Sequence, residues 1–202
     1  MSLPKRSESS ISMRDHAVSI NFEKLDEGQL IQYFEKPQYI EDVFRELLRR
    51  FQAPIYAYTR NMLSSHDDAD DATQNTFIKV WKGLPNFRGE SKLRTWMYRI
   101  ASNECINLLR KKKNNIDFDE ALPELSDYLT DTQNVSSDDI EMKLQKAMCY
   151  LPYKQKLVFV LKYFEDLSYD EISDLTQTSV GALKSSYHHA VKKLEIYLNV
   201  LR

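Results

Sequence analysis

The chain has 202 residues, only 4 of them glycine and 6 proline, and a formal net charge of −2. Stretches rich in leucine, lysine, glutamate and alanine favour helices over strands and turns. There is no run of about 18 apolar residues, and the N-terminal stretch MSLPKRSESSISMRDH lacks the apolar core of a secretory signal. We therefore expect no membrane insertion and a cytoplasmic location. Cys105 and Cys149 lack metal-ligand spacing, which predicts buried thiols in a reducing compartment.

The charged residues are sorted by position along the chain. Residues 79–113 carry 10 basic and 2 acidic side chains, residues 114–141 carry 9 acidic and no basic ones, and residues 142–202 carry 9 basic and 6 acidic ones. A basic block attracts a polyanion such as nucleic acid, whereas an acidic block repels it. The pattern predicts two modules that meet a polyanion, joined by a tether that does not.

The first elements in chain order are four helices. Residues 1–24 are rich in serine and charge and are expected to be disordered. Apolar residues then recur at helical spacing, in a short stripe before Pro37 and in a longer one that we expect to bend or restart at Pro54. Two more helices are predicted, over residues 68–82 and, after the breaking stretch GLPNFRGES, over 92–112. Their expected inward residues are Ala72, Phe77, Ile78, Trp81, Met97, Ile100, Ala101 and Leu108.

The stretch of residues 114–139 has many acidic residues, a proline and weak periodicity, and it is predicted to be a linker. Four further helices are expected, over residues 140–151, 153–164, 169–176 and 180–201. The predicted fold class is therefore all-α, with two small helical domains joined by an acidic linker.

The last two predicted helices have helix-turn-helix spacing. Ser168 and Glu171 have the spacing of a capping box, and the stretch TQTS then breaks the chain before a second helix. On that helix, apolar residues recur every three or four positions, and small, hydroxyl and cationic residues line another face. Such a face can bond phosphates or base edges, although an ordinary solvated face is also polar. His188 and His189 point about 100° apart on a helix, so we expect no metal site.

Two stretches carry a resemblance to a known family. The C-terminal stretch LSYDEISDLTQTSVGALKSSYHHAVKKL resembles the DNA-binding region of bacterial RNA polymerase sigma factors of the two-domain extracytoplasmic-function (ECF) group. The stretch DADDATQNTFIKVWKGLPNFRGESKLRTWMYRIASNECINLLRKKK independently resembles the N-terminal module of the same group. Together the matches cover most of residues 44–113 and 140–198.

The chain departs from the family pattern at a few positions. Gln177 replaces the usual turn glycine, and Thr178 replaces an apolar neighbour. Gln adopts a left-handed conformation only at some cost, which bears on the turn geometry. Many relatives carry arginine where this chain has Ser186 and His189, so the recognition helix is less cationic than theirs.

The resemblance implies a role for each part of the chain. After an extension at 1–24, residues 25–113 would form a sigma region 2-like domain that binds core RNA polymerase and recognises and melts the −10 element. Residues 114–139 would be the linker, and 140–202 a region 4-like helix-turn-helix domain that recognises the −35 element. The implied partners are core RNA polymerase and promoter DNA. Family members commonly also have an anti-sigma factor, and this sequence identifies none. We expect neither an enzyme nor a cofactor.

Three sets of residues carry these implied roles. A polar ridge, expected on the side of its helix opposite Phe77 and Trp81, would bind core polymerase: Asp68, Asp71, Gln74, Asn75 and Lys79. A loop and a helix would bind the −10 element: Asn86, Phe87, Arg88, Gly89, Glu90, Ser91, Lys92, Tyr98, Arg99, Asn103, Asn107 and Arg110. Phe87 suits a core anchor equally well, and Tyr98, like the nearby Trp96 outside this set, suits stacking on bases or on the core. The recognition helix would bind the −35 element: Ser179, Gly181, Ala182, Lys184, Ser185, Ser186, His188, His189 and Lys192.

Two other kinds of protein remain open at this point. A helix-turn-helix regulator could bind an operator alone, with residues 25–113 supplying an effector or dimerisation module. The stretch DDADD at 67–71 has the spacing that holds magnesium and a diphosphate in all-α prenyl-transferring enzymes. Such enzymes need a large helical cavity and a second metal motif, and this chain has no second acidic cluster in a predicted helix core.

Overall fold

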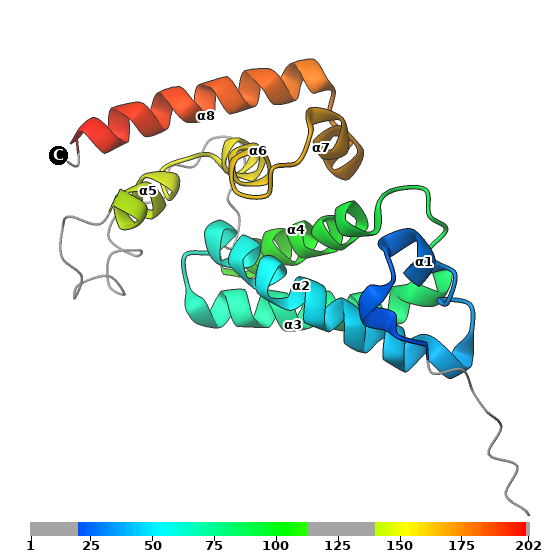
Figure 1. The fold of residues 1–202 in the computed structure, drawn as a ribbon. Coiled ribbons are helices and arrows are strands. Elements are labelled where there is room, and N and C mark those ends of the chain that lie inside the picture. Colours follow the sequence, from blue (N-terminus) through cyan, green and yellow to red (C-terminus); the bar gives the residue numbers. More distant parts are fainter. Residues whose placement is uncertain (1–19, 113–139, 201–202) are drawn as a thin grey trace, which may run out of the picture.

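The structure is a computed structural model that describes residues 20–112 and 140–200. Every regular element in these two ranges is a helix, which confirms the predicted all-α class (Figure 1). The predicted acidic linker, residues 114–139, lies outside the described residues. The α-helices are α1 (Glu27–Ile31), α2 (Ile40–Met62), α3 (His66–Gly83), α4 (Leu93–Lys112), α5 (Ile140–Met148), α6 (Tyr153–Tyr163), α7 (Tyr169–Thr176) and α8 (Val180–Val200).

Helices α2, α3 and α4 pack around the first core. Leu47, Ile55, Val80 and Met97 are fully buried in it. Helix α2 continues through Pro54 as one helix of 23 residues, so the expected restart does not occur. Proline removes one intrahelical hydrogen bond, and the burial of apolar residues on both sides of it favours a continuous helix.

The inward face predicted for the third helix is wrong at two positions. Ile78 is 50% exposed and Trp81 is 39% exposed. Helix α3 instead buries a face that includes Ala72, Thr76 and Val80, because it packs against both α2 and α4. Trp81 rests on the ring of Phe44 with 4.9 Å between ring centroids. An apolar surface therefore remains uncovered by the described residues.

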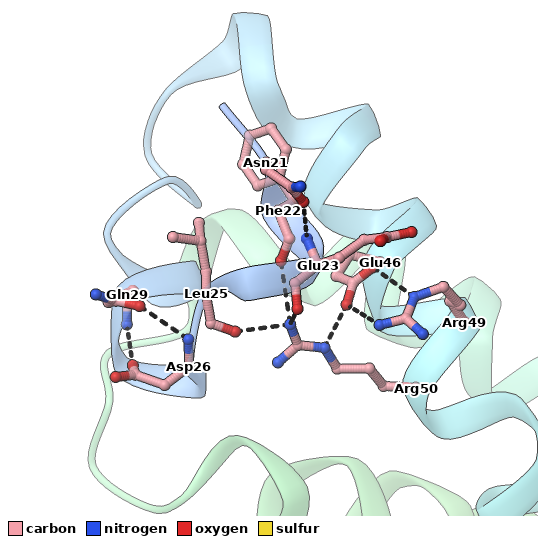
Figure 2. Close-up of polar contacts among 9 residues, drawn as sticks. All are labelled: Asn21, Phe22, Glu23, Leu25, Asp26, Gln29, Glu46, Arg49 and Arg50. Carbon is pink, nitrogen blue, oxygen red and sulfur yellow. Dashed lines mark hydrogen bonds and ion pairs between the residues drawn. The ribbon is translucent and has the colours of Figure 1, made fainter. Parts of the chain in front are cut away.

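The segment before α1 is folded onto α2, as Figure 2 shows. The Arg50 guanidinium donates to the backbone oxygens of Phe22 and Leu25, at 3.0 and 2.6 Å, and its Nε donates to Glu46. Residues 20–24 therefore differ from the disordered extension predicted for 1–24, because backbone oxygens of this segment accept from a guanidinium of α2. Residues 1–19 lie outside the described part.

Helices α6, α7 and α8 pack together, with α5 against α8, around apolar side chains that include Leu161, Ile172 and Leu183. Cys105 is buried in the first core as predicted. Cys149, in contrast, is only half-buried; it follows the end of α5, and its thiol lies 3.1 Å from the hydroxyl of Ser64. Within the described ranges, none of the helices combines the length and apolar character needed to cross a membrane.

Candidate nucleic-acid interface

Helix α8 presents its predicted polar face to solvent. Leu183, Ala190 and Leu194 are buried against α6 and α7. The side chains of the face are exposed except for a half-buried Ser186; the exposed ones belong to Ser179, Ala182, Lys184, Ser185, His188, His189 and Lys192, with Gly181 beside them. A Cβ added at Gly181 would have no atom within 4 Å, so the start of the face has open space around it. The face can therefore approach a large surface.

The turn before α8 keeps helix-turn-helix geometry despite its unusual residues. Gln177 ends α7 in the left-handed conformation, with φ 55° and ψ 36°. Its side-chain amide donates to the carbonyl oxygen of Asp174 at 2.8 Å, which helps to hold that conformation. Ser179 then accepts from the backbone N–H of Ala182 at 3.4 Å and caps α8. Gln177 thus takes the left-handed conformation that glycine usually supplies in such a turn.

The helix α7 begins as the sequence predicts. Ser168 Oγ accepts from the N–H of Glu171, and the Glu171 carboxylate accepts from the N–H of Ser168 at 2.8 Å, which completes the capping box. The side chain of Lys92, on the first bundle, donates to the same carboxylate at 2.8 Å. These interactions with Lys92 and Ser168 lower the pKa of Glu171 to about 2.

Helix α4 exposes only part of its predicted face. Asn103, Asn107 and Arg110 are exposed. Tyr98 is fully buried, and its hydroxyl donates to the carboxylate of Glu165, at the end of α6. Arg99 Nη2 donates to the carbonyl oxygen of Asp174 in α7 at 2.7 Å. In this arrangement Tyr98 cannot meet DNA, and Arg99 is already engaged, because the second bundle covers this part of α4.

The loop between α3 and α4 is anchored at one residue and exposed at most others. Phe87 packs between Phe34 and Trp96, with ring centroids 5.8 and 5.0 Å away, so it is a core anchor in this structure. Gly89 has a φ of 71°, which favours glycine at that position. The remaining loop residues are exposed or, for Ser91, half-buried; they are Asn86, Arg88, Glu90, Ser91 and Lys92.

The polar ridge of α3 lies beside an apolar groove. Asp71, Asn75 and Lys79 are exposed, and Lys79 forms an ion pair with Glu104 of α4. Asp68, the first ridge residue, is half-buried. Gln74 lines the groove together with Phe44, Leu48, Phe77, Ile78 and Trp81. The sequence placed the ridge opposite Phe77 and Trp81, and this is wrong for Gln74, because both aromatic residues border the exposed groove.

Contacts between the two bundles are the feature that sequence reasoning missed. Helix α4 packs on α7, and α2 packs on α6 (Figure 1). Arg94 donates to the carbonyl oxygen of Glu165 at 2.9 Å, close to the bond from Tyr98. Burial raises the pKa of Glu165, and the bonds from Tyr98 and Arg94 oppose this rise. Glu165 follows the C-terminus of α6, where a carboxylate is disfavoured by the helix dipole. This unfavourable position was the one sign in the sequence that Glu165 has a partner in another part of the chain.

Comparison with known proteins decides the family. The family model "Sigma-70 region 2" matches residues 47–115, and "Sigma-70, region 4" matches residues 141–194. The ECF RNA polymerase sigma factor SigW of Bacillus subtilis is 30% identical over 171 residues, covering 80% of this chain and 91% of SigW. The chain belongs to the ECF sigma factors. The RNA polymerase sigma-H factor of Pseudomonas aeruginosa is also 30% identical, over 181 residues, covering 81% of this chain and 94% of that protein.

Solved structures agree with the fold of this ECF sigma factor. The sigma factor RpoE of Bartonella quintana, in complex with the anti-sigma factor NepR, has a TM-score of 0.62 at 24% identity, covering 79% of this chain and 98% of RpoE. CnrH, in complex with the cytosolic domain of CnrY, has a TM-score of 0.64 at 20% identity, covering 85% and 96%. As an ECF sigma factor, the protein directs promoter recognition and transcription initiation.

Proposed function

We propose that the two bundles of this sigma factor read the two promoter elements separately. Residues 140–202 would read the −35 element, and residues 25–113 would bind core RNA polymerase and read and open the −10 element, without catalysing a reaction. One observation carries the proposal. Helices α8 and α4 each expose a polar face, and the apolar residues on the other side of each helix are buried in the core of its bundle. Each face is thereby held rigidly, as base readout requires.

The α8 face has the chemistry of major-groove readout. In a helix-turn-helix, the N-terminal part of the second helix contacts base edges, and here that part spans residues 179–189. Hydroxyl groups of Ser179 and Ser185 can bond bases or phosphates, and Lys184 adds a cation that can bond guanine or phosphate. Small residues at the start of the helix allow close approach.

The α4 face and the preceding loop suit a strand that is being opened. Asn103 and Asn107 carry amides that can bond adenine in two places, and Arg110 adds a cation. An unpaired base must be held after it leaves the stack, and the loop at 86–92 offers exposed donors such as Arg88 for that purpose. Because the second bundle engages Tyr98 through Glu165 and Arg99 through Asp174, full engagement of this face requires the two bundles to separate.

The ridge and groove on α2 and α3 suit core polymerase. The groove is about 730 Å³ in volume, and its apolar walls lie beside exposed polar groups of the ridge. An amphipathic helix laid into such a groove would bury Ile78 and Trp81 and could pair with Asp71 and Asn75. We assign this surface to the clamp coiled coil of the polymerase, in the cytoplasm.

An anti-sigma factor is a further expected partner. Both similar solved structures are complexes of a sigma factor with an anti-sigma protein or a cytosolic domain bound to it. These likenesses support the same kind of regulation here, and the identity of the partner would come from co-purification.

Reconstitution tests the proposal. The protein is added to core RNA polymerase with genomic DNA, and the transcripts are sequenced for specific start sites. We expect Lys184→Ala to reduce specific initiation about tenfold, because it removes one base or phosphate contact. The control is Asn199→Ala, an exposed position near the far end of α8.

Two outcomes would contradict the proposal. One is the absence of a stable complex between the folded protein and core polymerase at low salt. The other is tight, specific binding of duplex DNA by the protein alone, which would favour a stand-alone regulator, since a sigma factor needs polymerase to hold its two modules at a fixed separation.

A further inference from the structure

A small cavity lies at the junction of the two bundles, away from the faces assigned to DNA and polymerase. Its volume is about 140 Å³, and its walls come from the end of α2, the start of α3, α5 and the start of α6. A water molecule takes about 30 Å³ in the liquid, so the cavity has room for an ion with several oxygen atoms.

The walls of this junction cavity are cationic. Arg60 contributes a cation from the first bundle, beside the ring of His66, and Lys146 and Lys156 contribute cations from the second. No carboxylate is among its lining residues in the described ranges. Arg60, Lys146 and Lys156 form no ion pair with any residue that the structure describes. Like charges from two bundles therefore meet in one small space without a counter-charge.

Lys156 is the side chain that most needs a counter-charge. It is only 8% exposed and has no hydrogen-bond partner within residues 20–112 and 140–200. Burial lowers its pKa; the thiols of Cys149 and Cys105 oppose this, and the nearby Arg60 guanidinium lowers it further. A buried ammonium without an anion is costly, and one beside another cation is more so.

The first bundle also offers hydrogen-bond donors to an anion in the cavity. Arg60 Nη1 donates to the backbone oxygens of Leu63 and Ser64, in the turn after α2. Its Nε and Nη2 bond no residue in the part of the chain that the structure describes. Ser64 adds a hydroxyl, which lies 3.1 Å from the Cys149 thiol.

We propose that the junction cavity binds a phosphate-type oxyanion, held by Arg60 from the first bundle and by Lys146 and Lys156 from the second. Charge-assisted bonds from guanidinium and ammonium groups to phosphate oxygens are the strongest that these side chains make. Because the ligand contacts both bundles, it stabilises their packed arrangement and disfavours their separation.

The test is a titration of the purified full chain with sodium phosphate against sodium chloride of equal ionic strength. Heat of binding and thermal unfolding are both followed. At phosphate concentrations about ten times Kd, the unfolding midpoint should rise by about 3–5 °C more than in chloride. Glycerol phosphate is titrated in parallel, because tighter binding of this monoester would indicate a phosphorylated metabolite, and tighter binding of inorganic phosphate a free ion. Both results support the proposal.

Matched variants locate the site. Lys146→Met should weaken phosphate binding at least fivefold, whereas Lys143→Met, on the same helix but outside the lining, should leave it unchanged. Lys156→Met should abolish the phosphate effect and raise the midpoint measured in chloride, because an unpaired buried charge is replaced by an apolar side chain of similar length. Should Lys156→Met fail to fold, Arg60→Gln provides the second removal of a cation.

Three results would overturn the proposal. The first is a phosphate effect no larger than that of chloride for the unaltered chain, with glycerol phosphate equally inactive. The second is equal weakening by Lys143→Met and Lys146→Met, which would indicate general charge screening. The third is hydrogen-exchange protection by phosphate at only one of the segments 60–66 and 142–149, which would contradict a ligand that joins both bundles.

Discussion

Glu46 is a carboxylate whose side chain is only 4% exposed, and it is kept ionised by two neighbours on α2. Bonds from Arg49 and Arg50 lower its pKa to about 2, against the opposing effect of burial. Arg50 is the more connected of the two, since it also donates to backbone oxygens of residues 22, 23 and 25 (Figure 2). A single guanidinium thus adds three polar contacts to a segment whose Phe22 and Leu25 also pack against the core.

Replacement of Arg50 by methionine should release that segment and leave Glu46 with Arg49 as its remaining partner. We expect the free energy of unfolding of the first bundle to fall by about 1–3 kcal/mol, since several partly buried acceptors lose a charged donor. Denaturant unfolding followed by tryptophan fluorescence measures it, because both tryptophans, Trp81 and Trp96, lie in this bundle. Arg45→Met, which breaks an exposed pair with Asp42, should cost less than about 0.5 kcal/mol. Equal losses in the two variants would contradict the role of Arg50.

At the scale of elements, the helix-turn-helix depends on two ends of α7. The capping box at Ser168 fixes where the helix begins, and the left-handed Gln177 fixes where the chain turns. A positive φ is unfavourable for any residue with a Cβ. Gln177 is held in this conformation by the hydrogen bond from its side-chain amide to Asp174 and by the packing of α7 on α8. The turn is therefore geometrically normal at a residue that is not optimal for it.

Gln177→Gly should relieve this strain without moving α8. We expect the second bundle to gain about 0.5–1 kcal/mol, less than the full left-handed penalty because glycine loses more backbone entropy and the amide bond is removed. Hydrogen exchange of the α7 amides should slow about two- to fivefold. Gln177→Ala is the control, since it removes the amide but keeps the Cβ, and it should speed exchange. Faster exchange in Gln177→Gly would show that the amide bond outweighs the strain.

At the scale of the whole molecule, the two bundles pack against each other through side chains that we assign to promoter binding. The Tyr98–Glu165 bond, the Arg94 and Arg99 bonds to carbonyl oxygens and the Lys92–Glu171 pair all cross the junction. Several of these groups come from the helix and loop assigned to the −10 element. Under the proposed assignment, this packed arrangement competes with promoter DNA for the same side chains, and we expect the sigma factor to open when it binds a promoter.

A disulfide across the junction tests whether opening is required. Ser64 Oγ lies 3.1 Å from Cys149 Sγ, so Ser64→Cys would place two sulfurs near bonding distance with a small adjustment. We expect the oxidised variant to lose initiation by more than tenfold with core polymerase, and to recover it on reduction. Ser64→Cys combined with Cys149→Ser cannot form the bridge and should initiate normally under both conditions. Full activity of the oxidised, bridged protein would contradict the need for opening.

The approximate positions of the helices from α3 onward and the capping box could be predicted, because each depends on residues within about four positions of one another. The restart expected at Pro54, in contrast, does not occur. The family motifs could be recognised for the same reason, since they are continuous stretches. The polar face of α8 followed from helical periodicity alone, and its exposure matches that prediction.

The partners that distant helices supply could not be predicted in this way. Ile78 and Trp81 look like core residues by spacing, yet no described helix packs over them. Tyr98 fits a DNA-facing helix by sequence, yet it is buried by Glu165, which lies 67 residues away along the chain. Periodicity states which residues share a side of a helix, but burial of that side depends on which other helix reaches it, and only the tertiary structure decides that.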